Sequence, residues 1–317
     1  MMKKLLKKSI VYGFLLIIAL EILVRIFHLG KDNPTRYLDQ YGVEKWEPNQ
    51  HGFSVTGNRK QNFSEYKINS SGFNSYREFT PTKDKIEIAI VGDSFIEGFH
   101  QDYFNSIGKK VENALPETEV YEYGYAGYDM ADQLHLIHKY KEQFDVIDHV
   151  VIYIKFSDDL TRGSYNIVRD RLALESPLNK ALKKSKLLVY SKSIGVFAPI
   201  KQLITKSINS IKGNNTKHIT QNNSNTNINK NKKYIDNFKS LITTYGYDKD
   251  RFVLLLDSKI ASPDFIVYLK ENNFDFIDFS EAFQSSNQPN TLIYDQHWNN
   301  HGRDIIASLI SEYINHK

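Results

Sequence analysis

The stretch that decides the fold is Lys85-Ile86-Glu87-Ile88-Ala89-Ile90-Val91-Gly92-Asp93-Ser94. Its apolar, β-branched run is typical of a strand buried on both faces, and Gly92-Asp93-Ser94 ends that strand in a turn. Further strand-like runs follow at 119–123, 149–154, 251–256 and 274–278. Helical patterns lie between and after them, at 103–114, 130–143, 233–245 and 302–314. Strands that alternate with helices predict an α/β domain whose largely parallel sheet is covered on both faces.

Ser94 is the first candidate for chemistry, because it directly follows the first predicted strand. In parallel sheets, ligands bind at the carboxyl ends of the strands. A serine at a strand-to-helix turn also gains from the free N–H groups of the helix, which can stabilise a developing anion. Serine is equally an ordinary helix N-cap, so Gly-Asp-Ser alone does not establish catalysis.

A second polar motif, Tyr294-Asp295-Gln296-His297-Trp298-Asn299-Asn300-His301-Gly302, lies near the C-terminus. In an extended segment, Asp295 and His297 share a face, and a nucleophile needs a base that a third group orients. His301 is a competing base, but it stands at the predicted start of the last helix. The alternative is a surface loop whose Asn caps that helix. Serine, aspartate and histidine motifs in one chain together favour a catalytic site.

Three blocks of sequence resemble the SGNH/GDSL hydrolase superfamily, and more narrowly its membrane-anchored bacterial members of the O-acetyl esterase or acyltransferase type. The blocks are Gly92-Asp93-Ser94-Phe95 with Gly98, Gly124-Tyr125-Ala126-Gly127-Tyr128, and Asp295-Gln296-His297-Trp298-Asn299 with Gly302. The upstream Ile68-Asn69-Ser70-Ser71-Gly72-Phe73 is similar to a lead-in of that group. The resemblance runs from about residue 69 to the C-terminus, apart from one insertion.

The resemblance implies a flavodoxin-like three-layer α/β/α sandwich that cleaves or transfers esters through an acyl-serine. It implies Ser94 as nucleophile, His297 as base and Asp295 as the acid that orients the base. The oxyanion hole would use the backbone N–H groups of Ser94 and Gly127 and an Asn side chain from a further block. This chemistry requires no cofactor and no metal, and the histidines show no metal-ligand spacing.

The chain departs from the family pattern at two places. After the third strand comes Lys155-Phe156-Ser157-Asp158-Asp159, and Asp158 takes the place of the expected Asn. An ionised carboxylate cannot donate a hydrogen bond, so Asp158 is protonated, another donor substitutes, or hydrolysis is weakened. In addition, one residue separates Asp295 from His297 where simpler members have two. That spacing is similar to relatives that act on polysaccharide O-acetyl groups and favours carbohydrate esters.

Residues 1–29 are predicted to form a cytoplasmic tail and a membrane anchor. Four lysines within residues 3–8 precede an apolar stretch, and a helix over 10–29 would rise about 30 Å, enough to cross the hydrocarbon core. The lysines predict a cytoplasmic N-terminus, with the rest of the chain periplasmic or extracellular. A cleaved signal peptide and a buried helix are the alternatives, and the flank after Glu21 has no small-residue cleavage site.

Beyond the anchor we predict an irregular lead-in at 30–80 and a catalytic domain at 81–317 with an insertion at about 176–235. That insertion carries twelve lysines and no acidic residue. Its first part is expected to form basic amphipathic helices, and its Asn-rich second part, 213–231, a flexible linker. The helices would either pack on the core with a solvated lysine face or bind anionic lipid or an acidic polymer.

Composition narrows the class of function further. The 317 residues carry 41 Lys and Arg against 37 Asp and Glu, an excess of +4 that does not indicate a nucleic-acid binder. The absence of cysteine excludes disulfides, thiolate zinc sites and cysteine nucleophiles. The resemblance, together with the predicted anchor, implies an envelope serine ester hydrolase or O-acyltransferase that acts on an acylated glycan or cell-surface polymer. The alternative is a weakly active or inactive binding or assembly protein with the same fold.

Overall fold

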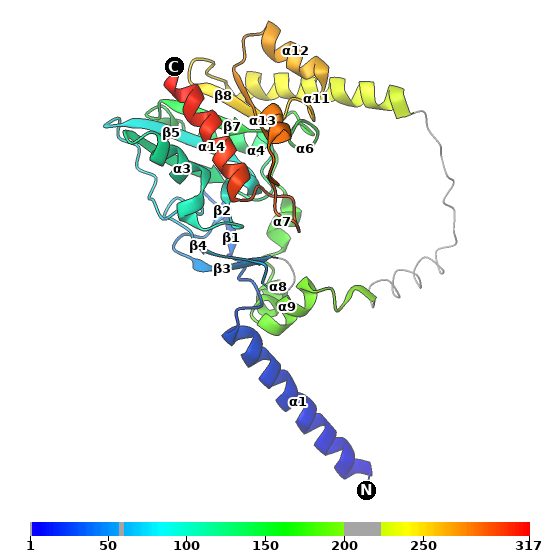
Figure 1. Ribbon diagram of the computed structural model, residues 1–317. Coiled ribbons are helices and arrows are strands. Elements are labelled where there is room, and N and C mark those ends of the chain that lie inside the picture. Colours follow the sequence, from blue (N-terminus) through cyan, green and yellow to red (C-terminus); the bar gives the residue numbers. More distant parts are fainter. Residues whose placement is uncertain (1, 57–59, 200–222) are drawn as a thin grey trace. The chain divides into compact units, whose positions relative to one another are not determined.

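The structure is a computed structural model that describes residues 2–56, 60–199 and 223–317 (Figure 1). The chain divides into two compact units. The first unit holds residues 1–33, 52–63 and 170–221, and the second holds residues 34–51, 64–169 and 222–317, as far as these are described. The lead-in predicted at 30–80 is therefore distributed over both units.

Five parallel strands form the central sheet of the second unit (Figure 1). In spatial order they are β6 (Thr118–Gly124), β5 (Ile86–Gly92), β7 (His149–Tyr153), β8 (Phe252–Leu256) and β9 (Phe276–Asp278). Numbered by their place in this sheet along the chain, the order is 2-1-3-4-5, the flavodoxin-like order. The fold class predicted from the sequence is confirmed.

Strand β5 lies inside the sheet, which explains its continuous apolar run. Residues 88–91 are fully buried, and they alternate between two hydrophobic clusters, one on each face of the sheet. Ile88 and Ile90 pack on the face that carries α3 (Ile107–Ala114) and α14 (Asn300–Asn315). Ala89 and Val91 pack on the face that carries α4, α11 and α12. These helices are α4 (Met130–Lys139), α11 (Asn223–Tyr245) and α12 (Pro263–Glu271). The short helix α5 (Lys141–Phe144) follows α4.

The lead-in is more regular than the sequence predicts, because it contains four short strands. They are β1 (Arg36–Leu38), β2 (Glu44–Trp46), β3 (His51–Thr56) and β4 (Asn62–Lys67). β1 and β2 pair antiparallel, and β3 with β4 forms another two-stranded sheet. Buried aromatic side chains such as Trp46 and Phe73 join the core on one face of the large sheet. Tertiary packing, rather than a long apolar pattern, therefore orders this segment.

Several predicted boundaries shift in the structure. The helix predicted at 103–114 is split at Ser106 into a 3-10 turn, Tyr103–Asn105, and α3. The last strand begins at Phe276 rather than at residue 274. Helix α11 begins at Asn223, inside the segment predicted to be a flexible linker, while 213–222 lies outside the described residues. Two further short helices, α2 (Ser94–Glu97) and α13 (Ser280–Ser285), follow β5 and β9.

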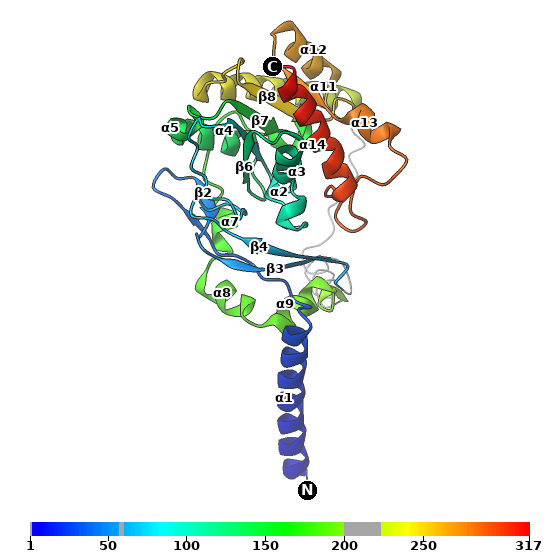
Figure 2. The ribbon, with the colours of Figure 1, turned by 60° about the vertical axis from the view of Figure 1, so that its left-hand side comes forward.

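The first unit contains the N-terminal helix and the described residues 176–199 of the insertion (Figure 2). Helix α1 (Met2–Ile26) is long and apolar enough to span a membrane, although a signal sequence would pass the same test. Helix α7 (Arg169–Ala173) precedes the insertion, which forms α8 (Pro177–Lys183) and α9 (Lys186–Ser193) here, and α9 packs against α1. Basic helices are thus present as predicted, and residues 200–222 of the insertion lie outside the described part.

Candidate active site

The strand order reverses between β5 and β7, and the loops after these two strands form the candidate site. In sheets of this order, the crevice at such a reversal is where ligands bind. Asp93 follows β5, and Lys155 follows β7. The two loops are joined by an ion pair in which Lys155 Nζ lies 2.5 Å from Asp93 Oδ2. Burial lowers the pKa of Lys155, but the carboxylates of Asp93, Asp159 and Asp158 outweigh it and raise the pKa overall.

Ser94 is the first residue of the short helix α2. The side chain of Asp93 caps this helix by accepting a hydrogen bond from the N–H of Phe95 at 2.9 Å. The Asp93 carbonyl accepts bonds from the next two N–H groups, those of Ile96 and Glu97. For the N–H of Ser94 itself, no acceptor is found in the described part of the chain. The backbone N–H of Ser94 is therefore free to donate a hydrogen bond to an oxyanion that forms next to Ser94 Oγ.

Helix α2 is held in place from behind by the end of β6. A Cβ atom at Gly124 would lie 2.0 Å from the backbone nitrogen of Glu97, so glycine permits the approach of β6 to α2. The buried carboxylate of Glu97 accepts hydrogen bonds from Trp46 Nε1 at 2.7 Å and from the N–H of Ala126 at 3.1 Å. Burial, only partly offset by these two bonds, raises the pKa of Glu97 to about 7.

His297 faces Ser94 across the site. Its Nε2 lies 2.8 Å from Ser94 Oγ, and its Nδ1 lies 3.3 Å from Oδ1 of Asp295. The nucleophile, base and acid predicted from the sequence are thus brought together in the predicted order. The competing base His301 instead has its Nε2 2.8 Å from Ser286 Oγ. Asn299 caps α14, because its side-chain oxygen accepts a hydrogen bond from the N–H of Gly302. The same motif therefore caps the last helix, as the surface-loop alternative expected, and also places His297 beside Ser94.

The segment that carries Asp295 and His297 is not extended, contrary to the prediction. Gln296 between them has φ of +63°, in the left-handed region that non-glycine residues seldom occupy. The resulting turn lets Asp295 Oδ1 accept a hydrogen bond from the N–H of His297 at 3.2 Å as well. A tight turn, rather than strand alternation, therefore brings the carboxylate to the imidazole.

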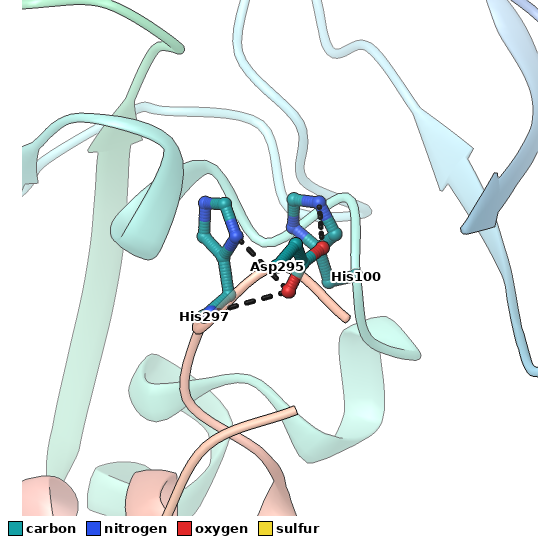
Figure 3. A group of neighbouring side chains, drawn as sticks. All are labelled: His100, Asp295 and His297. Atoms are coloured by element: carbon teal, nitrogen blue, oxygen red, sulfur yellow. Dashed lines mark hydrogen bonds and ion pairs between the residues drawn. The ribbon is translucent and has the colours of Figure 1, made fainter. Parts of the chain in front are cut away.

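Sequence reasoning missed His100, which lies against this pair (Figure 3). Its Nε2 is 3.1 Å from Asp295 Oδ2, and its ring stacks on that of His297 with centroids 3.9 Å apart and planes at 19°. The two oxygens of Asp295 therefore face two different imidazoles. No spacing motif could have found His100, because almost 200 residues separate it from Asp295.

His100, Asp295 and His297 also offer three potential metal-ligand atoms within 4.8 Å of one another. The fold brings these residues together, although their spacing in the sequence indicated no metal site. Within the group, Asp295 contacts both imidazoles, and His297 already bonds Ser94. The contact between His297 and Ser94 is the arrangement that proton transfer from a serine requires.

The remaining oxyanion-hole assignments stay predictions. Gly127 lies with φ of +92° in the exposed loop after β6. Asp158 is an exposed residue of α6 (Phe156–Asp159). Its neighbour Asp159 is buried and accepts a hydrogen bond from the N–H of Lys155 at 2.7 Å. Burial, reinforced by the charge of Asp93, raises the pKa of Asp159 well above its usual range.

A cavity of about 450 Å³ opens beside the triad, at the ends of β7 and β8. Its walls are rich in aromatic side chains: Phe95, Tyr153, Phe156, Phe279, Phe283 and Trp298. Polar groups at this cavity include Lys155, Asp158 and Gln296. Chain neighbours of Ser94 and His297 line this cavity: Phe95 follows Ser94, and Gln296 and Trp298 flank His297.

No family model and no curated protein matches this chain. Among solved structures, the chain is similar to the lipase/acylhydrolase from Enterococcus faecalis, at 14% identity and a TM-score of 0.40, covering 73% of this chain and 95% of that one. It is also similar to a member of the lipolytic G-D-S-L family from Veillonella parvula, at 14% identity and a TM-score of 0.38, covering 73% and 99%. The psychrotrophic esterase EstA from Pseudoalteromonas sp. matches at 12% identity and a TM-score of 0.38, and the match covers 73% of this chain and 99% of that one. We therefore base the function on the geometry of the site.

Proposed function

We propose that this protein is a serine ester hydrolase or O-acyltransferase of the cell envelope that acts on an acylated glycan or cell-surface polymer. The observation that carries the proposal is the 2.8 Å contact between Ser94 Oγ and His297 Nε2, with Asp295 behind the imidazole. A hydroxyl, a base and a carboxylate in this order constitute an activated nucleophile.

In the acylation step, Ser94 Oγ attacks the ester carbonyl carbon while His297 Nε2 takes the hydroxyl proton. Asp295 Oδ1 stabilises the imidazolium that forms, because it lies 3.3 Å from Nδ1. The N–H of Ser94 donates to the oxyanion, which is worth roughly 3 kcal/mol for one well-placed donor. Collapse of the tetrahedral intermediate breaks the ester bond, and His297 returns the proton to the leaving alkoxide. An acyl-Ser94 ester remains.

Deacylation decides between the two activities. Either water or a sugar hydroxyl attacks acyl-Ser94, with His297 again acting as base, and releases free acid or a new ester. Aromatic cavity walls support a substrate with apolar surfaces, such as the faces of sugar rings or an acyl chain. The N-terminal apolar helix supports a membrane location, and its four lysines favour a cytoplasmic N-terminus with the site on the other side.

The proposed activity is tested with p-nitrophenyl acetate and O-acetylated glycan as acyl donors, with and without unmodified glycan as acceptor. Wild-type protein is expected to release the alcohol of each donor. Ser94→Ala is expected to lose at least a thousandfold in kcat, because only Ser94 accepts the acyl group. Acetyl retained on the acceptor indicates transfer, and free acetate indicates hydrolysis. Equal turnover by wild type and Ser94→Ala contradicts the proposal.

One observation favours a second candidate, a weakly active or inactive binding protein of the envelope. Asp158 stands where the resemblance implies an amide donor, and an ionised carboxylate there repels an oxyanion. Under this candidate, Asp158→Asn raises kcat by about tenfold or more, since it replaces repulsion with a donor. Under our leading proposal, the variant changes kcat by less than threefold. Steady-state kinetics on p-nitrophenyl acetate distinguish the two.

A further inference from the structure

Helix α9 is attached to the outer part of α1 by the carboxylate of Glu21. Oε1 of Glu21 accepts a hydrogen bond from the N–H of Lys186 at 2.9 Å, and Oε2 accepts from the N–H of Leu187 at 2.8 Å and from Ser185 Oγ at 3.0 Å. Arg25 joins Glu21 to the same junction, because its Nη2 donates to the carbonyl of Lys184 at 2.6 Å. The hydrogen-bond partners of the Glu21 carboxylate are thus Arg25, the first residues of α9 and Ser185, which precedes α9.

The position of Glu21 sets the depth of α9 in a membrane that α1 spans. If Lys8 lies at one boundary of the hydrocarbon core, a rise of 1.5 Å per residue places Glu21 about 20 Å into a core that is about 30 Å thick. The N-terminus of α9 therefore lies about 10 Å inside the far boundary. Helices that lie in the membrane interface are immersed by about 5–10 Å.

The described insertion exposes an apolar surface next to this junction. Leu178 and Leu182, one turn apart on α8, are 70% and 45% exposed. After α9, residues Ile194, Val196 and Phe197 are 40%, 52% and 41% exposed. Apolar side chains exposed on adjoining segments of one basic unit indicate an interaction surface.

The charges on the same helices are basic. Lys180 and Lys184 lie on the side of α8 opposite to Leu178 and Leu182, as the 100° step of a helix requires. Together with Lys192 they are exposed, and none has an ion-pair partner in the described part of the chain. Lys183 and Lys186 are instead paired, with Glu175 and Asp32. Leucine on one face and unpaired lysine on the other is the pattern of a helix on an anionic lipid surface.

We infer that α8, α9 and residues 194–199 form a lipid-binding surface that lies in the outer boundary of the membrane that α1 spans. Leu178, Leu182 and Phe197 insert among the acyl chains, while Lys180, Lys184 and Lys192 contact anionic headgroups. Glu21 fixes this surface to α1 at the depth that the interface requires. The occupant is the bilayer itself, because α9 packs against a helix long and apolar enough to cross it. This inference rests on the proposed membrane span of α1 and does not depend on the proposed catalytic activity.

The chain contains no cysteine, so single-cysteine labelling tests the inference on the full-length protein. Leu178→Cys and the matched control Lys180→Cys are labelled with bimane in nanodiscs of phosphatidylcholine and phosphatidylglycerol at 3:1. We expect a nitroxide on the lipid acyl chain to quench the label at 178 at least threefold more than the label at 180. Aqueous iodide is expected to show the opposite preference. Equal lipid quenching at the two positions, or stronger quenching at 180, overturns the inference.

The headgroup contact is tested with a label at Leu182→Cys and bromine placed on either lipid. Brominated phosphatidylglycerol is expected to quench at least twofold more per mole than brominated phosphatidylcholine. Adding Lys180→Gln, Lys184→Gln and Lys192→Gln should abolish that preference while leaving quenching by the acyl-chain nitroxide in place. Equal quenching by both brominated lipids in the parent overturns the anionic part of the inference. A preference that survives the three substitutions overturns the role of the lysines.

Discussion

Asp295 is the residue on which the geometry of the triad depends, because its two oxygens face two imidazoles. Oδ1 lies 3.3 Å from His297 Nδ1, and Oδ2 lies 3.1 Å from His100 Nε2 (Figure 3). Contacts on both sides disfavour rotation of the carboxylate away from the imidazole of His297. We therefore predict that His100 acts through Asp295 as a positioning residue.

His100→Ala removes that second contact and the stacked ring. We expect kcat to fall on the order of tenfold with KM within twofold of wild type, because the position of Asp295 matters only when His297 becomes charged. His100→Gln keeps a side-chain N–H donor and should restore most of the loss. Steady-state kinetics across pH 5–9 provide the measurement. If Ala and Gln behave alike, or if only KM changes, the positioning role is wrong.

Gln296 is strained in the left-handed region, at φ of +63°. Gln296→Gly should keep or raise stability and retain the triad, since glycine adopts this φ freely. Gln296→Val should cost about 1–2 kcal/mol and reduce kcat, because a β-branched residue disfavours the turn. Thermal unfolding and kcat for both variants test this. Equal behaviour of Gly and Val would show that the turn does not position His297.

The structure brings together Ser94, Asp295 and His297, which the sequence singles out because their motifs lie beside elements that it reveals. Ser94 comes directly after an apolar run, and His297 directly precedes the last amphipathic helix. His100 was not predictable, because an isolated histidine in a loop carries no periodicity. The turn at Gln296 was also missed, since glutamine is not a residue that signals positive φ.

At the scale of elements, the contact between the end of β6 and α2 decides where Ser94 lies. Gly124 allows that contact, and a Cβ atom there would meet the backbone of Ile96 at 2.3 Å and of Glu97 at 2.0 Å. Neither neighbour is a flexible side chain that could move aside. The position of the nucleophile is therefore set by a glycine thirty residues away.

Gly124→Ala should displace α2 and lower kcat at least tenfold, with a loss of stability of roughly 1–3 kcal/mol from overpacking. Activity and the thermal unfolding midpoint are measured on the same preparation. Gly163→Ala is a control, because its nearest neighbour, at 3.0 Å, is the side-chain oxygen of Asn237 rather than backbone. A Gly124→Ala protein with wild-type kcat would contradict this account of the site.

The strands of the large sheet were predictable because β5, β7 and β8 are buried apolar runs, and their alternation with helices indicates a parallel arrangement. The four strands of the lead-in were not, because they are short and their order comes from packing aromatic residues such as Trp46 against the core. Helix α11 likewise begins among polar residues that favour turns, at Asn223. The local composition predicted a flexible linker at 213–231, but α11 extends about ten residues N-terminal to the amphipathic segment predicted at 233–245.

At the scale of the whole molecule, two buried carboxyls make stability depend on pH. Burial raises the pKa of both Glu97 and Glu122 to about 7, from an ordinary value near 4.5. The folded state therefore binds these protons more tightly than the unfolded state. Their contribution to stability is fully present below about pH 4.5 and is lost as pH rises through about 7.

Wild-type protein should consequently have a lower urea midpoint at pH 8 than at pH 5.5, with each carboxyl costing on the order of 1–3 kcal/mol at the higher pH. The double variant Glu97→Gln and Glu122→Gln should lose most of this difference, because the amides keep the acceptors for Trp46 and Gly108 without a charge. Urea unfolding of full-length protein in detergent at both pH values provides the test. An equal pH response of wild type and variant would exclude these groups as its cause.

The most direct test of the central claim is covalent labelling of Ser94. Full-length wild type, Ser94→Ala and His297→Ala are treated with a fluorophosphonate, and the adduct is located by peptide mass spectrometry. We predict one adduct on Ser94 in the wild type, none in Ser94→Ala, and labelling slowed at least a hundredfold in His297→Ala, which has lost the base. Folded wild-type protein that takes up no label, or a Ser94→Ala variant labelled as fast as the wild type, would contradict the account.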